Sequence, residues 1–288
     1  MTEFAAGPGY DMHLRKTLHP TPSNRGRSHP FDQPRPRADY QTVIIARRIA
    51  TVLFVVFIPV LLVTSNIRYL VGDVSFYERG LRDYDAEQVT SVPLYELDRA
   101  AGEIVSYFEN DSDELRIVVS ERDREVPLFN EQEVSHMRDV KSLIRFMFRL
   151  NEISLAYVIL YIGGSVLWAR ERSIRQLAFE ALGGIGVGLA ILVSLGVFAL
   201  TGFDRFWTTF HRIAFPNGLW QLDPDTDRLI QMFPEPFWQE ATYILGAMTL
   251  VEVSGIVLLA LGYLVNSRRA QQPARPIRPG RRAAPTSS

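Results

Sequence analysis

Apolar residues in this chain of 288 residues gather in four long blocks, and polar segments separate the blocks. Because a helix needs ~20 largely apolar residues to cross the hydrocarbon core of a bilayer, each block is long enough for one span once Phe146 and Phe148 extend the second. The pattern therefore predicts an all-α polytopic membrane protein. Its four transmembrane helices are expected at residues 45–71, 151–169, 177–201 and 242–265.

Two polar segments connect these spans on one side. Residues 72–150, which we call the cap, are long enough to need structure of their own. Apolar spacing predicts an amphipathic helix at 92–108 and short strands at 115–120 and 126–129, hence a small mixed α/β unit. Residues 202–241, the second loop, combine aromatic with acidic residues, which is typical of the membrane interface.

The charge distribution predicts the orientation. The net charge is only -1, yet acidic residues outnumber basic ones by 18 to 10 in residues 72–151 and by 6 to 3 in residues 201–241. Arginines instead flank the opposite ends of the spans. The positive-inside rule therefore places the cap and the second loop outside the cell and residues 1–44 and 266–288 in the cytoplasm.

Both terminal segments are rich in Pro and Arg and lack an apolar period, so we expect two disordered cytoplasmic tails. Their arginines suit anionic membrane lipid better than nucleic acid. The first apolar block begins nearly fifty residues into the chain and is too long for a secretory signal, so it is expected to stay as a transmembrane helix.

The residues available for chemistry are few. The chain has no cysteine, which excludes thiolate nucleophiles, disulfides and Cys-ligated zinc. His136 and His211 each lie beside a predicted span and, in the predicted orientation, on the same side. Asn130 as N-cap with Glu133 three residues later predicts a helix that holds His136 in its second turn and runs on into the second span.

Neighbouring polar residues suggest roles around these histidines. Asp139 follows His136 by three residues, so it would share nearly the same helix face and could orient the imidazole. The simpler explanation of Asp139 is a surface ion pair with a nearby cation. In the second loop, Pro216-Asn217-Gly218 predicts a turn, and Asp223-Pro224 predicts the start of a short helix that ends before Pro234.

Several other motifs carry less information. Asp223, Asp225 and Asp227 alternate as in a calcium loop, but the required Gly and Glu are absent, and we reject that interpretation. Gly184 and Gly188 predict close helix packing. The intramembrane carboxylates Glu180 and Glu252 lie away from the histidines and are not expected to be catalytic. The chain has no GxSxG motif, Walker loop, dinucleotide fingerprint or HExxH motif.

Three functions remain open on the residues alone. The first is an acid-base enzyme that uses both histidines. The second is a metal-dependent membrane hydrolase or lipid-modifying enzyme, in which His136, Asp139 and His211 would bind zinc. The third is a non-enzymatic sensor or assembly factor whose acidic cap binds a partner.

Two motifs resemble the lipoprotein intramolecular transacylase (Lit) family of bacterial integral membrane proteins. The first runs from Glu133 through His136 and Asp139 to Lys141 (EVSHMRDVK). The second begins about seventy-five residues later at Phe210-His211, and the resemblance covers roughly residues 45–265. The second motif continues through Phe215, Asn217, Trp220, Leu222, Asp223, Pro224, Asp227, Leu229 and Ile230.

The resemblance implies a specific reaction in the bacterial cytoplasmic membrane. Members of the family move the sn-2 acyl chain of a diacylglyceryl lipoprotein onto the α-amino group of its own lipidated cysteine, which gives the lyso form. It implies no cofactor and no metal, and a site at the outer membrane surface in contact with lipid. His136 and His211 would be the catalytic pair. The supporting or substrate-binding residues would be Asp139, Lys141, Asn217, Trp220, Asp223 and Asp227.

Overall fold

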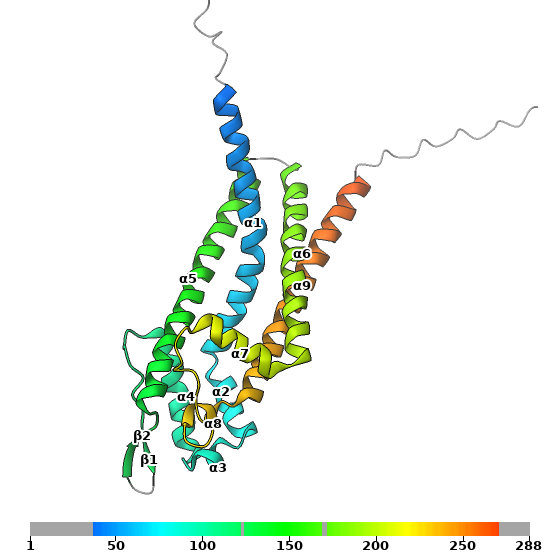
Figure 1. Cartoon of the computed structure of the whole chain (residues 1–288). Helices are drawn as coiled ribbons and strands as arrows, with labels where there is room; N and C mark the ends of the chain where they lie inside the picture. The colour runs from blue at the N-terminus through cyan, green and yellow to red at the C-terminus, as the bar shows by residue number, and fades with distance from the viewer. Residues whose placement is uncertain (1–36, 122–123, 169–171, 271–288) are drawn as a thin grey trace, which may run out of the picture. The chain divides into compact units, whose positions relative to one another are not determined.

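The computed structural model describes residues 37–121, 124–168 and 172–270. Four of its helices are long and apolar enough to cross a membrane. They run side by side within residues 45–270 (Figure 1), and the mostly helical architecture predicted from the sequence is confirmed. These helices are α1 (Arg37–Gly72), α5 (Glu131–Trp168), α6 (Arg172–Thr201) and α9 (Glu235–Ala270).

Close packing of α6 against α1 depends on two glycines. A Cβ atom on Gly184 would lie 2.6 Å from the carbonyl oxygen of Val55, and one on Gly188 would collide with the ring of Pro59. Since only a hydrogen side chain fits at both positions, the predicted packing role of this glycine pair is confirmed. On the other side of α1, Phe54 stacks on Tyr161 of α5 with ring centroids 4.3 Å apart.

The remaining elements gather where α1 ends and α5 begins (Figure 1). The cap contains α2 (Val74–Asp83), α3 (Ala86–Thr90), α4 (Leu94–Glu109), β1 (Val118–Glu121) and β2 (Arg124–Pro127), and the second loop contains α7 (Phe203–Ala214) and α8 (Arg228–Met232). Both segments contribute to one hydrophobic core. Its fully buried members include Leu81, Val92, Leu97, Ala100, Ala101, Met232 and Phe237.

The strands form one antiparallel hairpin, in which Val118 pairs with Pro127 and Glu121 with Arg124. Both lie slightly away from the predicted ranges. Leu115 and Ile117 precede the first strand, and their side chains are buried in the shared core. Leu128 continues the connection by donating its backbone N–H to the Ile117 carbonyl at 2.8 Å.

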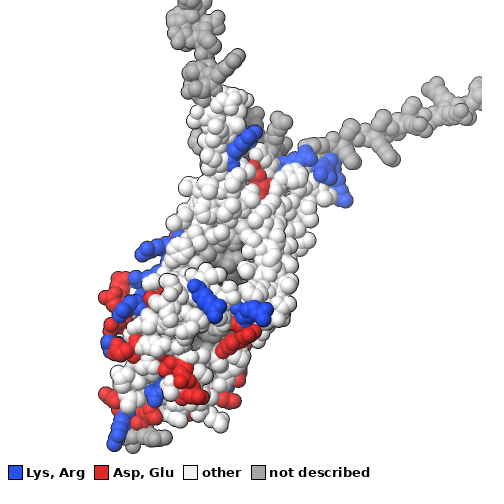
Figure 2. All heavy atoms as spheres, viewed as in Figure 1, with Lys and Arg blue, Asp and Glu red and all other residues white. Residues whose placement is uncertain are grey.

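Helix α5 is much longer than a bilayer requires. It has 38 residues, whereas ~20 suffice to cross the hydrocarbon core. Its first turns therefore extend beyond the membrane into the cap, where Val134 and Met137 join the core. Figure 2 agrees with this division, because charged side chains cover the cap while the surface along the spans is almost free of them.

The chain ends differ from the expectation. Helix α1 begins at Arg37 and α9 continues to Ala270, so residues 37–44 and 266–270, expected in tails, are helical. No proline interrupts either extension, which explains why the helices continue. The rest of the two tails, residues 1–36 and 271–288, lies outside the described residues.

The start of the short helix in the second loop also differs. Helix α8 begins at Arg228 with Asp227 at the N-cap position, whereas the sequence suggested a start at Asp223-Pro224. The Asp223 side chain instead accepts the backbone N–H of Asp225 at 2.9 Å. Its carbonyl accepts those of Thr226 and Asp227, so this segment forms a turn.

Candidate active site at the histidine pair

His136 is held by the beginning of α5. The Asn130 side chain accepts the backbone N–H groups of Gln132 and Glu133 at 2.9 and 3.0 Å, and the Glu133 carboxylate accepts the Asn130 N–H at 2.7 Å. This is the predicted capping arrangement, in which each residue satisfies a backbone donor of the other. His136 lies one turn after Glu133 and is 6% exposed.

His211 is fixed in place by its own helix. In α7 its Nδ1 lies 2.9 Å from the carbonyl oxygen of Trp207, one turn earlier. Because a carbonyl oxygen only accepts, Nδ1 must carry the proton. The neutral ring therefore has its lone pair on Nε2, which makes Nε2 the basic atom.

The two imidazole rings are neighbours, with centroids 6.2 Å apart and an interplanar angle of 34°. Aromatic rings surround them. Trp207 and Trp220 lie 4.4 and 5.1 Å from His211, and Phe215 contacts both histidines, at 5.1 Å from His136 and 5.7 Å from His211. Residues 75 positions apart in the sequence thus form one enclosed, largely apolar site.

This enclosure keeps both rings neutral. Burial lowers the pKa of His136 to about 4, helped by repulsion from His211 and opposed by Asp139. Burial also lowers the pKa of His211, and the hydrogen bond to the Trp207 carbonyl acts in the opposite direction. Nδ1 of His136 is buried without a hydrogen-bond partner, an arrangement that is costly unless a bound molecule supplies one.

Asp139 makes a different contact from the one the sequence suggested. It accepts a hydrogen bond from the Asn217 side chain at 2.8 Å. The Asn217 oxygen in turn accepts the backbone N–H of Leu219 at 3.2 Å, which shapes the predicted turn. The Asp139–Asn217 contact therefore joins the helix of His136 to the loop that follows His211.

Lys141 does not face the histidine pair. Its ammonium donates to the Asn110 side chain at 3.1 Å and to the Ser112 carbonyl at 2.6 Å, and it lies 3.9 Å from the ring centre of Tyr107. Five residues after His136, a helix has turned by about 140°, which explains the different face. In this structure Lys141 fastens α5 to the rest of the cap.

Glu133 and Asp227 form a buried connection between the cap and the second loop. Glu133, 1% exposed, accepts the backbone N–H of Leu229 at 2.6 Å, and Asp227 accepts the Asn130 side chain at 2.8 Å and the backbone N–H of Asp223 at 2.7 Å. Burial raises the pKa of Glu133 despite these bonds. Glu133 was not among the predicted site residues, although its position three residues after the N-cap Asn130 indicated that its side chain is held in place.

The metal hypothesis gains no support from this geometry. Within residues 37–121, 124–168 and 172–270, no three His, Cys, Asp or Glu side chains are placed to hold a metal ion. Asp139, the expected third ligand, is bonded to Asn217 instead.

Sequence comparisons relate the chain to a known family and to a further protein. The model of the family described as Lipoprotein intramolecular transacylase Lit matches residues 52–238. An uncharacterized protein of Aquifex aeolicus (strain VF5) is 27% identical over 137 residues, which are 47% of this chain. The chain spans 57% of the length of that relative.

Solved structures share the fold. The membrane integral lipoprotein intramolecular transacylase Lit from Bacillus cereus superposes with a TM-score of 0.63 at 17% identity, over 78% of this chain and 98% of that one. Its variant with a histidine-to-arginine mutation matches with a TM-score of 0.63 at 17% identity, over 82% and 99% of the two chains.

Proposed function

Because the chain belongs to the lipoprotein intramolecular transacylase (Lit) family of integral membrane acyltransferases, we propose that it converts a diacylglyceryl lipoprotein to the lyso form. The sn-2 acyl chain would move from glycerol to the α-amino group of the same N-terminal cysteine. The observation that carries this proposal is the histidine pair, enclosed by aromatic rings and assembled from two separate motifs.

The reaction needs a base and a stabilised oxyanion. The substrate amine attacks the ester carbonyl, a C–N bond forms, the ester C–O bond breaks, and the amine proton ends on the released sn-2 oxygen. An α-amino group has a pKa of about 7.7–8.0, so a neutral imidazole is a suitable acceptor as the amine becomes acidic during attack.

His211 is suited to be this base. Its Nδ1–H is committed to the Trp207 carbonyl, which leaves Nε2 free to take the amine proton and return it to the departing oxygen. The same hydrogen bond stabilises the imidazolium that forms in between. The Trp207 carbonyl thus takes the place that a carboxylate has in a catalytic triad.

His136 is suited to contact the reacting carbonyl. Its lowered pKa keeps it neutral, and its Nδ1 has no partner, so an Nδ1–H can donate to the oxygen on which negative charge develops. Asp139 and Asn217 hold the two histidine-bearing segments in register. Since amine and ester belong to one substrate, positioning supplies much of the remaining rate acceleration.

The site is proposed to face the outside of the bacterial cytoplasmic membrane, with both chain ends in the cytoplasm. The acidic cap and the arginines at the opposite span ends support this orientation. A site beside the interfacial helix α7 suits a substrate whose acyl chains lie in the bilayer while its peptide projects outward. Trp220 forms part of the wall that separates this site from water.

Mass spectrometry of the N-terminal lipopeptide tests the proposal. A model lipoprotein is expressed in a host that lacks other N-acylation, with the intact chain, with His136→Ala or with His211→Ala. We expect the lyso form with the intact chain and with the control Asp225→Asn, whose side chain lies in an exposed turn. Neither histidine variant should produce it. A free-amine diacylglyceryl product despite verified expression would refute the assignment.

A further inference from the structure

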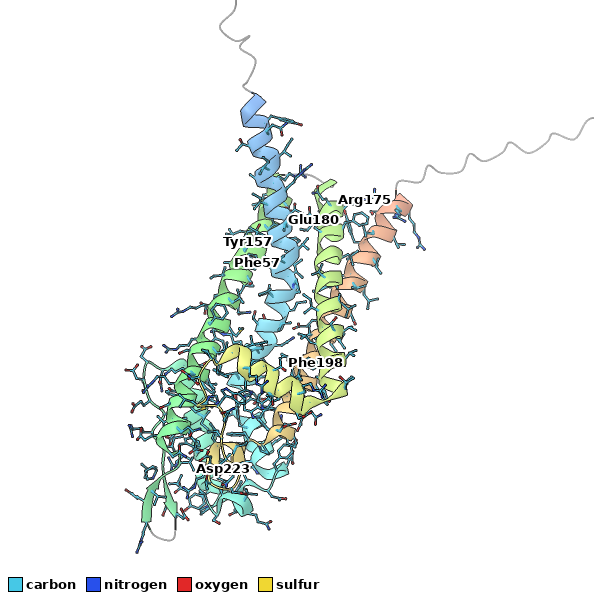
Figure 3. The ribbon with its side chains drawn as sticks, viewed as in Figure 1. Phe57, Tyr157, Arg175, Glu180, Phe198 and Asp223 are labelled. Atoms are coloured by element: carbon cyan, nitrogen blue, oxygen red, sulfur yellow. The ribbon has the colours of Figure 1, made fainter. Side chains whose placement is uncertain are left out.

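A second polar cluster lies within the helix bundle, near the end of α6 that is farthest from the cap. Figure 3 shows Glu180 and Arg175 there. The Glu180 carboxylate accepts hydrogen bonds from the hydroxyl of Thr51 at 3.2 Å, from Tyr161 at 2.8 Å and from the amide of Gln176 at 2.7 Å. Three helices, α1, α5 and α6, thus direct polar groups toward one carboxylate.

Two hollows flank this carboxylate. One, of about 450 Å³, is lined by Glu180 and Gln176 together with Arg175 and apolar residues of α1 and α6. The other, of about 370 Å³, is lined by the same two residues together with Arg47, Tyr161 and Ser165. Each hollow therefore offers a carboxylate, a guanidinium and an apolar wall.

The side chains that donate hydrogen bonds to Glu180 carry no positive charge. Thr51, Tyr161 and Gln176 are all neutral, and among the described residues no ion pair with Glu180 is formed. Arg47 donates a hydrogen bond to the Gln176 side chain at 2.8 Å, and Gln176 donates to Glu180. Arg47 is therefore linked to the carboxylate through Gln176. An ionisable group at membrane depth needs a partner of opposite charge or a proton, and a bound cation would supply the former.

The spacing between the arginines and Glu180 suits a lipid headgroup that carries one positive and one negative charge. Arg175 precedes Glu180 by five residues, which is a rise of about 7.5 Å along α6, and Arg47 approaches the same point from α1. Guanidinium groups bind phosphate strongly, and a carboxylate binds a primary ammonium through charge-assisted hydrogen bonds. The apolar walls, which include Val55, Phe179 and Leu160, suit the beginnings of acyl chains.

We propose that this cluster is a binding site for a glycerophospholipid with a primary-amine headgroup, its ammonium at Glu180 and its phosphate at Arg47 or Arg175. The site lies in the leaflet opposite the histidine pair. It does not depend on the proposed acyl transfer, because no residue is shared between the two sites.

Native mass spectrometry of the full chain in detergent tests this. The probes are phosphatidylethanolamine, phosphatidylcholine and phosphatidylglycerol with identical acyl chains. We expect about a tenfold preference for the ethanolamine lipid over the choline lipid, because a quaternary ammonium cannot donate hydrogen bonds to the carboxylate. Glu180→Gln should abolish that preference, and at least one of the variants Arg47→Gln and Arg175→Gln should weaken the binding of both lipids alike.

The matched control is Glu252→Gln, which removes another intramembrane carboxylate, one bonded to Asn66 at 3.0 Å. It should leave the preference unchanged. If Glu180→Gln does not fold, the lipid preference of the intact chain and the results for the two arginine variants still decide. Equal binding of the two lipids by the intact chain, a preference that survives Glu180→Gln, or equal competition by soluble phosphoethanolamine would overturn the proposal.

Discussion

The molecule carries two polar clusters of opposite design. The histidine pair lies at the cap end, where four aromatic rings surround two imidazoles. The Glu180 cluster lies at the other end, where two open hollows reach a carboxylate held by neutral donors. One site buries both of its imidazole rings, whereas the other has its carboxylate in the wall of two open hollows.

The difference follows from the elements that build each site. The histidine pair is assembled by the cap and the second loop, which share a core and are fastened by hydrogen bonds to the buried residues Glu133 and Asp227. The Glu180 cluster is formed by side chains of the spanning helices α1, α5 and α6, so we expect lipid to surround it. Enclosure suits chemistry on a bound substrate, and openness suits exchange of a lipid.

The largest expected effect concerns the enclosed site. Replacing His136 or His211 by alanine should each reduce the rate of acyl transfer by about 10²–10⁴-fold, because each supplies proton transfer or oxyanion stabilisation. The double variant should lose little more than either single variant, since the two act on one transition state. Initial rates of lyso-form production measure this. Fully additive losses would show that the histidines act independently.

The second prediction concerns the connection between cap and second loop. Glu133→Ala leaves the part-buried backbone N–H of Asn130 and the buried backbone N–H of Leu229 without acceptors and should cost about 1–3 kcal/mol of stability. Thermal unfolding in detergent should reveal this, and activity should fall with it. Glu133→Gln keeps one acceptor oxygen and serves as the milder control. Unchanged unfolding of the alanine variant would contradict the structural role of this carboxylate.

The sequence predicted the parts of this comparison that depend on local signals. Hydropathy identified the four spans, and the Asn130–Glu133 spacing identified the start of α5, because both are properties of neighbouring residues. Gly184 and Gly188 were likewise correctly interpreted as packing residues. The position of His136 above the second span followed from the same local pattern.

Contacts between distant segments were not predictable in the same way. Asp139 accepts a hydrogen bond from Asn217, 78 residues later, although His136 and several cationic residues lie nearer to it in the sequence. Lys141 points to the loop after α4, which only the packing of α4 against α5 determines. Asp227 rather than Asp223 precedes α8, since Asp227 is held by Asn130 from another element.

The third prediction tests whether the Asp139–Asn217 contact positions the pair. Asp139→Asn should reduce the turnover rate roughly 10- to 100-fold with little loss of stability, because a small displacement of a reacting group is costly. Adding Asn217→Asp exchanges donor and acceptor and should restore most of the rate. Measuring turnover and unfolding for the two single variants and the double variant separates positioning from folding. Failure of the exchange to rescue turnover would count against it.

The fourth prediction is a pH dependence that reports enclosure. Burial lowers the pKa of His211, the proposed base, below its usual 6.5, so the loss of activity on acidification should be centred below pH 6.5. Neutral imidazole is required, and it disappears only as pH falls through the lowered pKa. Phe215→Ala admits water and should raise the pKa of His211 toward 6.5.

The rate of Phe215→Ala relative to the intact chain should then fall up to about tenfold between pH 8 and pH 5.5, as a group of ordinary pKa becomes protonated. Using the ratio removes the contribution of the substrate amine, which titrates equally in both reactions. A ratio that does not change with pH would show that the aromatic wall does not control the charge of His211.

The smallest expected effect is that of a change at Glu180 on acyl transfer, because we expect the two clusters to act independently. Glu180 and the cap end of α6 are separated by 21 residues, or roughly 30 Å of helix. Variants at such separation combine additively within about 0.3–0.5 kcal/mol when they share no partners. Glu180→Gln should therefore change acyl transfer by less than about twofold, both in the intact chain and in the Asp139→Asn background. A larger, background-dependent change in the rate would mean that the occupied lipid site alters the histidine pair through α6, and the two clusters would then be parts of one functional unit.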